Sequence, residues 1–320
     1  MAPVPPEVVY DVQNIHTALT YAVPDQEALV NIIGRREYQQ LIEIARYYKS
    51  LYNTDLATEL DRRIIGSVGS LLSFACMNRV LAGVLYLHNA GKSKRKYEVL
   101  RKNDTAVEVF CERVLVGRTP EEIRELQGAF TAVYHSDLRD HIMSYLHDDV
   151  VKAFFTAILQ DKEEKPLEDR KAAIEKFHSL LYGHDLAAVL EYVSSLTTAQ
   201  LCDLVRHYNM CYQDSHTVTT IRKQFGHKHK GEQLDVLLFA VMQASDPARH
   251  IALLLENSMY GLGTNEDQLS RLVVLHRGNM MERVKTAYHV DNSRTLADRI
   301  RGDTSGLYSN LLCHLINQTI

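Results

Sequence analysis

The last quarter of the chain repeats the first quarter at a displacement of 240 residues. Leu296 then matches Leu56, and Gly306 matches Gly66. Two weaker copies lie between them, around 107–123 and 183–201, so the repeating unit is about 80 residues long. A unit of this size buries its own faces poorly. We therefore expect each copy to pack against its neighbours.

Apolar residues recur with the period of an α-helix almost everywhere in the chain. One helix face near the end of the sequence collects five of them, Leu307, Leu311, Leu312, Leu315 and Ile316. Residues at these spacings share one face of a helix. Thr119 followed by Pro120 is typical of a helix start. The pattern predicts many short helices of about 8–18 residues and an all-α fold.

Composition and charge exclude several classes of protein. Hydrophobic residues make up 46% of the chain, which is enough to build a core without disulfides. The net charge of −4 argues against a general nucleic-acid-binding protein. The five cysteines contain no C-x-x-C pair and predict neither a disulfide framework nor a zinc site. The N-terminal stretch lacks the apolar segment of a signal peptide, so we expect a cytoplasmic protein.

The sharpest candidate site lies in the last copy, in the segment MYGLGTNE at 259–266. Gly261 and Gly263 allow the chain to bend sharply. An acidic residue, Asp303, follows 40 positions after the second glycine, in the segment RGDTSG. Taken one by one, these residues have structural explanations: the glycines could end a helix in a left-handed cap. Asp303 or Thr304 could equally cap the following helix.

The combination M-x-G-x-G-T-[DN]-E, followed about 40 residues later by G-D-T-S-G, resembles an annexin repeat. The resemblance is strong over 245–320 and weaker over the rest of the chain. It implies a calcium site made of three loop carbonyls and one distant carboxylate, those of Met259, Gly261, Gly263 and Asp303. It also implies that a second, weaker cation could use the Thr264 carbonyl and Glu266.

A calcium ion bound by these four residues would keep coordination positions open for a membrane lipid. Calcium takes about six to eight oxygen ligands in irregular geometry. Three carbonyls and a bidentate Asp303 supply roughly five, which leaves about one to three positions for water or a lipid phosphate oxygen. As in annexins, the ion would bridge the protein and an anionic membrane. Calcium and lipid would then strengthen each other's binding, because such coupling is reciprocal.

The other three copies depart from this pattern. At the position of Gly263 they carry Val23, Thr105 and Gly183. At the position of Asp303 they carry Arg63, Tyr145 and, with a shift of one residue, Lys228. Cations at two of these positions would repel calcium, so we expect an ordinary site in the last copy only. Atypical sites stay open because acidic residues lie nearby, among them Asp25, Glu27 and Glu108.

A basic run at 92–102 carries six positive groups and one negative group. It could contact sulfated glycans, acidic lipid headgroups or the acidic surface of microtubules. The alternative, which we favour, is a solvated helix face, because charge runs usually serve only to solvate a surface.

Sequence motifs of enzymes fail in this chain. Gly91-Lys92-Ser93 resembles the end of a phosphate-binding loop, but Tyr86 stands where that loop needs its first glycine. No H-E-x-x-H or G-x-S-x-G segment occurs. We therefore expect no enzymatic activity.

The annexin resemblance implies a domain organisation as well as a fold. It predicts four repeats of about five helices each, packed into a curved disc. We assign residues 1–90 to a short head and repeat 1, 91–163 to repeat 2, 164–245 to repeat 3 and 246–320 to repeat 4. The short head and the loss of three sites also resemble a divergent protist annexin of the alpha-giardin type.

The predicted function is calcium-dependent peripheral binding to anionic phospholipid membranes through the calcium site of repeat 4. Such a protein would be cytoplasmic and peripheral at the plasma membrane or the cytoskeleton. The alternative is a structural protein that binds cytoskeleton or polyanions, with calcium only modulatory.

Overall fold

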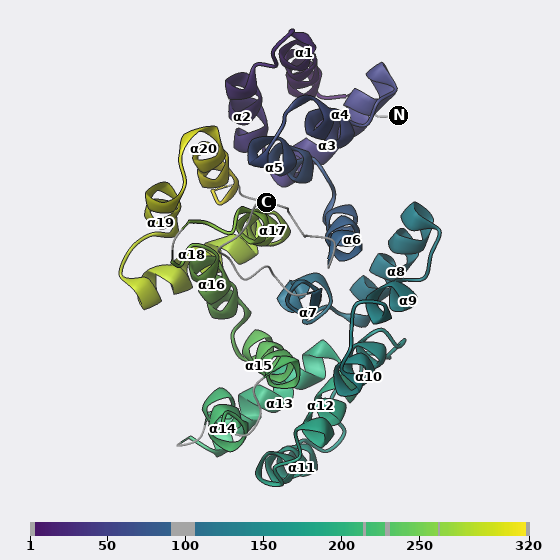
Figure 1. Ribbon diagram of the computed structural model, residues 1–320, viewed down its shortest axis with the longest axis vertical. Coiled ribbons are helices and arrows are strands. Elements are labelled where there is room, and N and C mark those ends of the chain that lie inside the picture. The colour runs from purple at the N-terminus through teal and green to yellow at the C-terminus, as the bar shows by residue number, and fades with distance from the viewer. Residues whose placement is uncertain (1–3, 91–105, 214–215, 228–230, 262, 318–320) are drawn as a thin grey trace. The chain divides into compact units, whose positions relative to one another are not determined.

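The computed structural model describes residues 4–90, 106–213, 216–227, 231–261 and 263–317 (Figure 1). Within these ranges it contains twenty α-helices, one short π-helix and no strand. The prediction of an all-α fold is confirmed. The basic run at 92–102 lies outside the described residues, as do Thr105 and Lys228.

The twenty α-helices of the described residues fall into four successive groups of five. The first group is α1 (Pro6–Thr20), α2 (Gln26–Arg35), α3 (Tyr38–Tyr52), α4 (Leu56–Arg63) and α5 (Ser67–Ala75). The second is α6 (Arg79–Asn89), α7 (Ala106–Val109), the π-helix η1 (Phe110–Val114), α8 (Pro120–Tyr134), α9 (Leu138–Met143) and α10 (Asp149–Ile158). The third is α11 (Arg170–Tyr182), α12 (Leu186–Ser195), α13 (Thr198–Cys211), α14 (Thr217–Phe225) and α15 (Glu232–Ser245). The fourth is α16 (Pro247–Ser258), α17 (Glu266–His276), α18 (Asn279–Asn292), α19 (Leu296–Asp303) and α20 (Gly306–Leu315).

Helices α1 and α6 each carry a histidine that makes the same kind of aromatic contact. His16 of α1 stacks on Tyr52 with ring centroids 3.7 Å apart. His88 of α6 stacks on Tyr134 in the same way, at 3.6 Å. We therefore propose that the second repeat begins with α6 rather than at residue 91.

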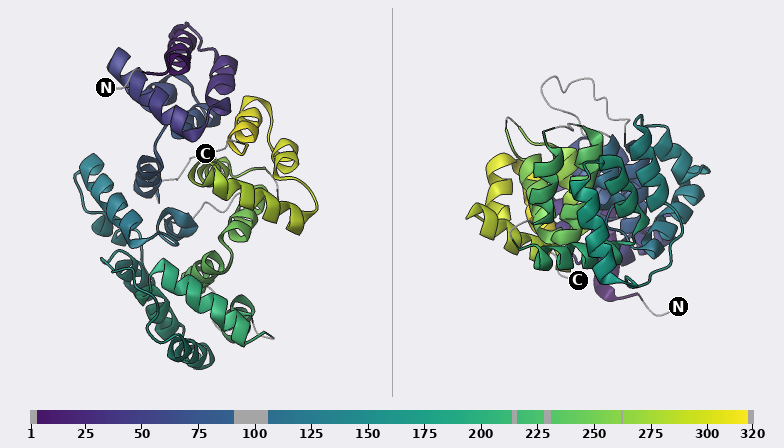
Figure 2. Two further views of the ribbon diagram at one scale, coloured as in Figure 1. Left: turned by 180° about the vertical axis from the view of Figure 1, so that it is seen from behind. Right: turned by 90° about the horizontal axis from the view of Figure 1, so that it is seen from below.

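The chain divides into two compact units, residues 1–82 with 248–320, and residues 83–247. In the first unit α2 lies beside α20, and α5 packs against α17 and α20 (Figures 1 and 2). In the second unit α12 packs against α10 and α15. The first and last repeats thus bury their apolar faces against each other, as expected for copies too small to fold alone.

The core of the first unit forms where α2, α5 and α20 meet. Ile33 of α2, Leu71 of α5 and Leu311 of α20 are fully buried. Gly34 allows α2 to approach α20 closely, because a Cβ at this position would lie 2.8 Å from Nδ1 of His314. This packing fixes the first repeat against the fourth, which carries the predicted site.

None of the described helices is long and apolar enough to cross a membrane.

Candidate calcium site

The predicted loop lies between α16, which ends at Ser258, and α17, which begins at Glu266. The N–H of Asn265 donates to the carbonyl of Ser258 at 2.7 Å and closes the base of the loop. The side chain of Asn265 then caps α17 by accepting from the N–H of Gln268 at 3.1 Å. Side chains of this type satisfy the free N–H groups at a helix start. The local sequence therefore fixes both ends of the loop.

Both glycines of the loop adopt left-handed backbone conformations. The φ angle is 93° at Gly261 and 82° at Gly263. Side chains rarely tolerate these angles, so glycine is needed at both positions. Neither glycine ends α16, because that helix stops at Ser258. The side chain of Met259 is fully buried and anchors the loop, whereas that of Tyr260 is 79% exposed.

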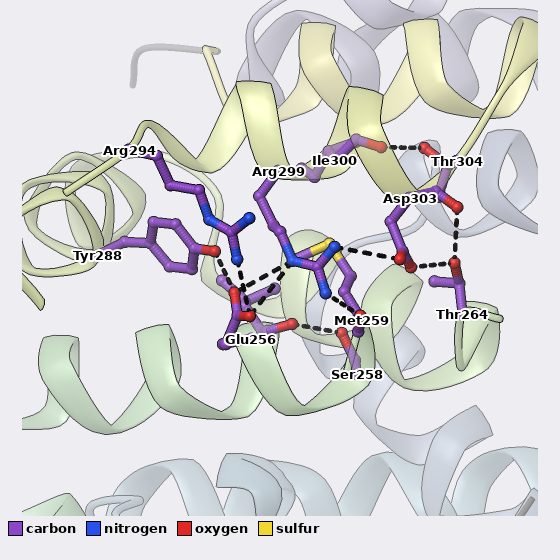
Figure 3. Close-up of polar contacts among 11 residues, drawn as sticks. Glu256, Ser258, Met259, Thr264, Tyr288, Arg294, Arg299, Ile300, Asp303 and Thr304 are labelled. Atoms are coloured by element: carbon purple, nitrogen blue, oxygen red, sulfur yellow. Dashed lines mark hydrogen bonds and ion pairs between the residues drawn. The ribbon is translucent and has the colours of Figure 1, made fainter. Parts of the chain in front are cut away.

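Asp303 is the last residue of α19 and contacts this loop. The hydroxyl of Thr264 lies 3.0 Å from the carbonyl of Asp303 and also contacts its carboxylate oxygen Oδ2 (Figure 3). The following helix, α20, has Ser305 at its cap position. Neither Asp303 nor Thr304 therefore caps that helix, and the predicted meeting of loop and carboxylate is present.

A guanidinium group lies where the loop and the carboxylate meet. Arg299 stands one turn before Asp303 on α19 and donates from Nη1 to Oδ1 of Asp303 at 3.1 Å. Its Nη2 donates to the carbonyl of Met259 (Figure 3). Both side chains are largely shielded, at 14% and 13% exposure. Two of the predicted calcium ligands therefore already contact one cation.

Glu256 of α16 contacts the same guanidinium from the other side. Nε of Arg299 lies 3.3 Å from each oxygen of the Glu256 carboxylate (Figure 3). The carboxylate also accepts from Arg294 at 2.9 Å and from the hydroxyl of Tyr288. Burial and the hydrogen bond to Glu256 raise the pKa of Tyr288 to about 12. Glu256 is thus the centre of a second polar cluster next to the loop.

Glu266 was predicted to share a second cation with the carbonyl of Thr264. In the structure its carboxylate accepts a hydrogen bond from Ser67, the first residue of α5. Its backbone carbonyl accepts from Tyr308 at 2.9 Å. These contacts place the start of α5 beside the loop of repeat 4.

The described residues contain no group of three or more His, Cys, Asp or Glu that could hold a metal ion. A cation at the loop would therefore rely on backbone carbonyls together with Asp303. Carbonyl and carboxylate oxygens are the ligands that calcium prefers. The donor set at the loop therefore suits calcium, although Arg299 contacts two of its members.

The equivalent loop of the first repeat holds a guanidinium directly. Arg63, which matches Asp303, donates to the carbonyl of Leu19 from Nε at 3.1 Å and from Nη2 at 2.8 Å. Its Nη2 also donates to the carbonyl of Tyr21 at 2.6 Å. At the displacement of 240 residues these carbonyls match those of Met259 and Gly261. The sequence predicted that Arg63 would repel calcium, and the structure shows it bonded to the carbonyls themselves.

In the second unit, Gly183 at the position of Gly263 and Asp148, three residues after Tyr145, end or begin helices. Gly183 caps α11 with an ordinary φ of −73°, and Asp185 already caps α12. Asp148 caps α10 and also accepts from Gln233 at 2.8 Å. Burial alone would raise the pKa of Asp148, but these hydrogen bonds outweigh it and lower the pKa. Neither residue has the surroundings of the repeat 4 loop.

The sequence interpretation missed the roles of Arg299 and Glu256. The spacing of Arg299 and Asp303 contained a usable signal, because oppositely charged residues four apart on a helix form ion pairs. Nothing in the sequence connected Glu256 to them across some 40 residues.

Comparison with known proteins shows similarity to annexins. The annexin family model matches residues 10–73 and 250–315, in the first and fourth repeats. Annexin D3 from Arabidopsis thaliana is 22% identical over 98% of this chain and 97% of its own length. The first and fourth repeats are similar to annexin repeats, and the whole chain is similar to annexins.

The annexin fold extends over the whole chain. Chicken annexin V is similar with a TM-score of 0.81 at 21% identity, over 99% of this chain and 98% of that one. Calcium-bound alpha-14 giardin is similar with a TM-score of 0.77 at 16% identity, over 96% and 99%. The likeness to the giardin is one of fold. The predicted annexin fold is confirmed.

Proposed function

We propose that this protein binds anionic phospholipid membranes in a calcium-dependent manner through the loop of repeat 4. Similarity to the annexin family supports calcium-dependent phospholipid binding in general. The observation that carries the specific proposal is the convergence of the Met259 carbonyl and the Asp303 carboxylate on one cation, Arg299. Calcium held by these ligands would supply open positions for a lipid phosphate.

Exposed apolar side chains beside the loop support contact with a membrane. Tyr260, within the loop, is 79% exposed, and Ile65 is 94% exposed. Ile65 lies two residues before Ser67, whose hydroxyl contacts Glu266 at the end of the loop. In the first repeat, Val23 is 80% exposed in the loop that Arg63 holds. Apolar side chains that surround an ion site fit the boundary between headgroups and acyl chains.

A vesicle-binding experiment with Asp303→Asn tests this proposal. Asparagine keeps the size of the side chain but removes the only full negative charge among the four proposed ligands. We expect calcium-dependent co-sedimentation with phosphatidylserine vesicles to be lost, while the protein still melts cooperatively in EDTA. Asp298→Asn is the matched control, because Asp298 lies on the same helix with its side chain 65% exposed. Unchanged calcium-dependent binding by Asp303→Asn would refute the proposal.

The basic run at 92–102 supports a second candidate function, binding to sulfated glycans or cytoskeleton. This function would not need the repeat 4 loop. Binding to heparin or microtubules that is equal in EDTA and in calcium, and equal in Asp303→Asn, would favour it. Neither candidate requires a catalytic step.

A further inference from the structure

We propose that Arg299 is a built-in cation that closes the calcium site of repeat 4 and must leave Met259 and Asp303 before calcium can bind. The inference rests on the proposed function, because it concerns regulation of the same site. Arg299 would thereby set the calcium concentration at which this protein binds a membrane.

The hydrogen bonds of Asp303 show why the guanidinium must leave. Oδ1 accepts from Arg299 at 3.1 Å, and Oδ2 contacts the hydroxyl of Thr264. Bidentate coordination of calcium would use both oxygens, and the guanidinium bonded to Oδ1 competes with the ion for that oxygen. The carbonyl of Met259 is also occupied by Arg299. A calcium ion and a guanidinium at this distance would in addition repel each other strongly, because the site is shielded from water.

Glu256 gives the displaced guanidinium another partner. Nε of Arg299 is already 3.3 Å from both Glu256 oxygens, and the Glu256 side chain is 19% exposed. Arg299 can therefore release the loop and keep an ion pair. A shielded charge left without any partner would be costly. The contact with Glu256 makes displacement by calcium feasible.

In the first repeat the two charges at the corresponding helix positions are exchanged. At a displacement of 240 residues, Glu59 stands at the position of Arg299 and Arg63 at the position of Asp303. Arg63 bonds to the loop carbonyls of Leu19 and Tyr21. In the first repeat an arginine of α4, and in the fourth repeat an arginine of the equivalent helix α19, donates to the first carbonyl of the loop.

The two arginines differ in what surrounds them. In the first repeat the residue at the position of Glu256 is His16, which stacks on Tyr52. The nearby carboxylate of Glu59 pairs with Arg62 at 2.6 Å. Among the described residues, the recorded hydrogen bonds of Arg63 go to backbone carbonyls and none goes to a carboxylate. We infer that Arg63 is a permanent substitute for calcium and that Arg299 is a displaceable one.

Calcium titration of Arg299→Gln tests the inference. Glutamine keeps much of the side-chain length and removes the charge. In the absence of lipid, calorimetric titration should show calcium binding at least about fivefold tighter than in the natural protein, the lower end of usual coupling effects. The calcium needed for half-maximal binding to phosphatidylserine vesicles should fall in parallel. Arg301→Gln is the matched control, because Arg301 lies on the same helix with its side chain 61% exposed.

Thermal melting provides a second measurement that does not depend on membrane binding. In EDTA, Arg299→Gln should melt below the natural protein, because Asp303 and Glu256 lose a partner. The rise in melting temperature on adding calcium should be larger in the variant, since tighter binding stabilises more. The double variant Arg299→Gln, Asp303→Asn should lose this gain. If Arg299→Gln fails to fold, Arg299→Lys keeps the charge without the bidentate fork and should bind calcium more tightly than the natural protein.

The outcomes separate this inference from the proposed function. Calcium binding that is unchanged or weaker in Arg299→Gln, with the natural protein binding calcium through Asp303, would overturn the role of Arg299 and leave the function standing. Absence of calcium binding in both the natural protein and Arg299→Gln would overturn both. Tighter binding that persists in the double variant would place the ion elsewhere and overturn the inference.

Discussion

The guanidinium of Arg63 reaches the carbonyl of Leu19 with two hydrogen bonds, at 3.1 and 2.8 Å. Leu19 occupies in the first repeat the position that Met259 occupies in the fourth. Hydrogen bonds from a charged donor are stronger than neutral ones. The loop of the first repeat is therefore held in shape by a side chain.

Replacing Arg63 should destabilise the first repeat whether or not calcium is present. Arg63→Ala removes three hydrogen bonds to two carbonyls, and we expect a loss of about 1–3 kcal/mol in the free energy of unfolding. Urea unfolding in EDTA and in calcium measures the effect. Arg62→Ala is the control, because Arg62 is 64% exposed and pairs only within its own helix. Full rescue of Arg63→Ala by calcium would contradict the account.

The exposed side chains beside the repeat 4 loop should contribute to membrane affinity but not to calcium affinity. Ile65→Ser and Tyr260→Ser should each weaken calcium-dependent vesicle binding by about fivefold. This corresponds to the loss of about 1 kcal/mol of binding free energy from partial burial of an apolar side chain in the membrane. Calcium binding without lipid should not change. Val290→Ser is the control, since Val290 is 72% exposed on α18. Equal effects of Ile65→Ser and Val290→Ser would remove Ile65 from the membrane contact.

His250 should make the protein less stable in mild acid. Burial in α16 lowers the pKa of His250 to about 4, whereas an unfolded histidine has a pKa of about 6.5. The unfolded state therefore takes up the proton first. Stability is fully present above about pH 6.5 and is lost as the pH falls towards 4.

Comparison of unfolding free energies at pH 7.5 and pH 5 measures this effect. The two pKa values give a loss of about 2 kcal/mol over this interval. In His250→Gln the drop in unfolding free energy between pH 7.5 and pH 5 should be smaller by that amount. In the control His289→Gln, at an exposed histidine, the drop should equal that of the natural protein. A pH dependence that is identical in His250→Gln and the natural protein would exclude His250 as its source.

Local chemistry in the sequence was sufficient to predict the helices and the shape of the repeat 4 loop. The helical period of apolar residues identified the segment that became α20, because burial of one face stabilises a short helix. Gly261 and Gly263 were expected at sharp bends, and both have left-handed φ angles. Asp303 was placed near the loop by the spacing of an annexin repeat, and it contacts Thr264. Each of these predictions concerns neighbours in sequence or a known repeat.

The partners of Arg299 were decided by the tertiary structure alone. Its spacing to Asp303 predicts one ion pair, yet the guanidinium also contacts Met259 and Glu256, about 40 residues earlier. A long charged side chain has several acceptors within reach. The one it binds depends on which helices pack together and how far water is excluded. The sequence therefore supplies the loop and the carboxylate, and the contacts of Arg299 with Glu256 and Met259, which form only in the folded chain, determine that an arginine lies between them.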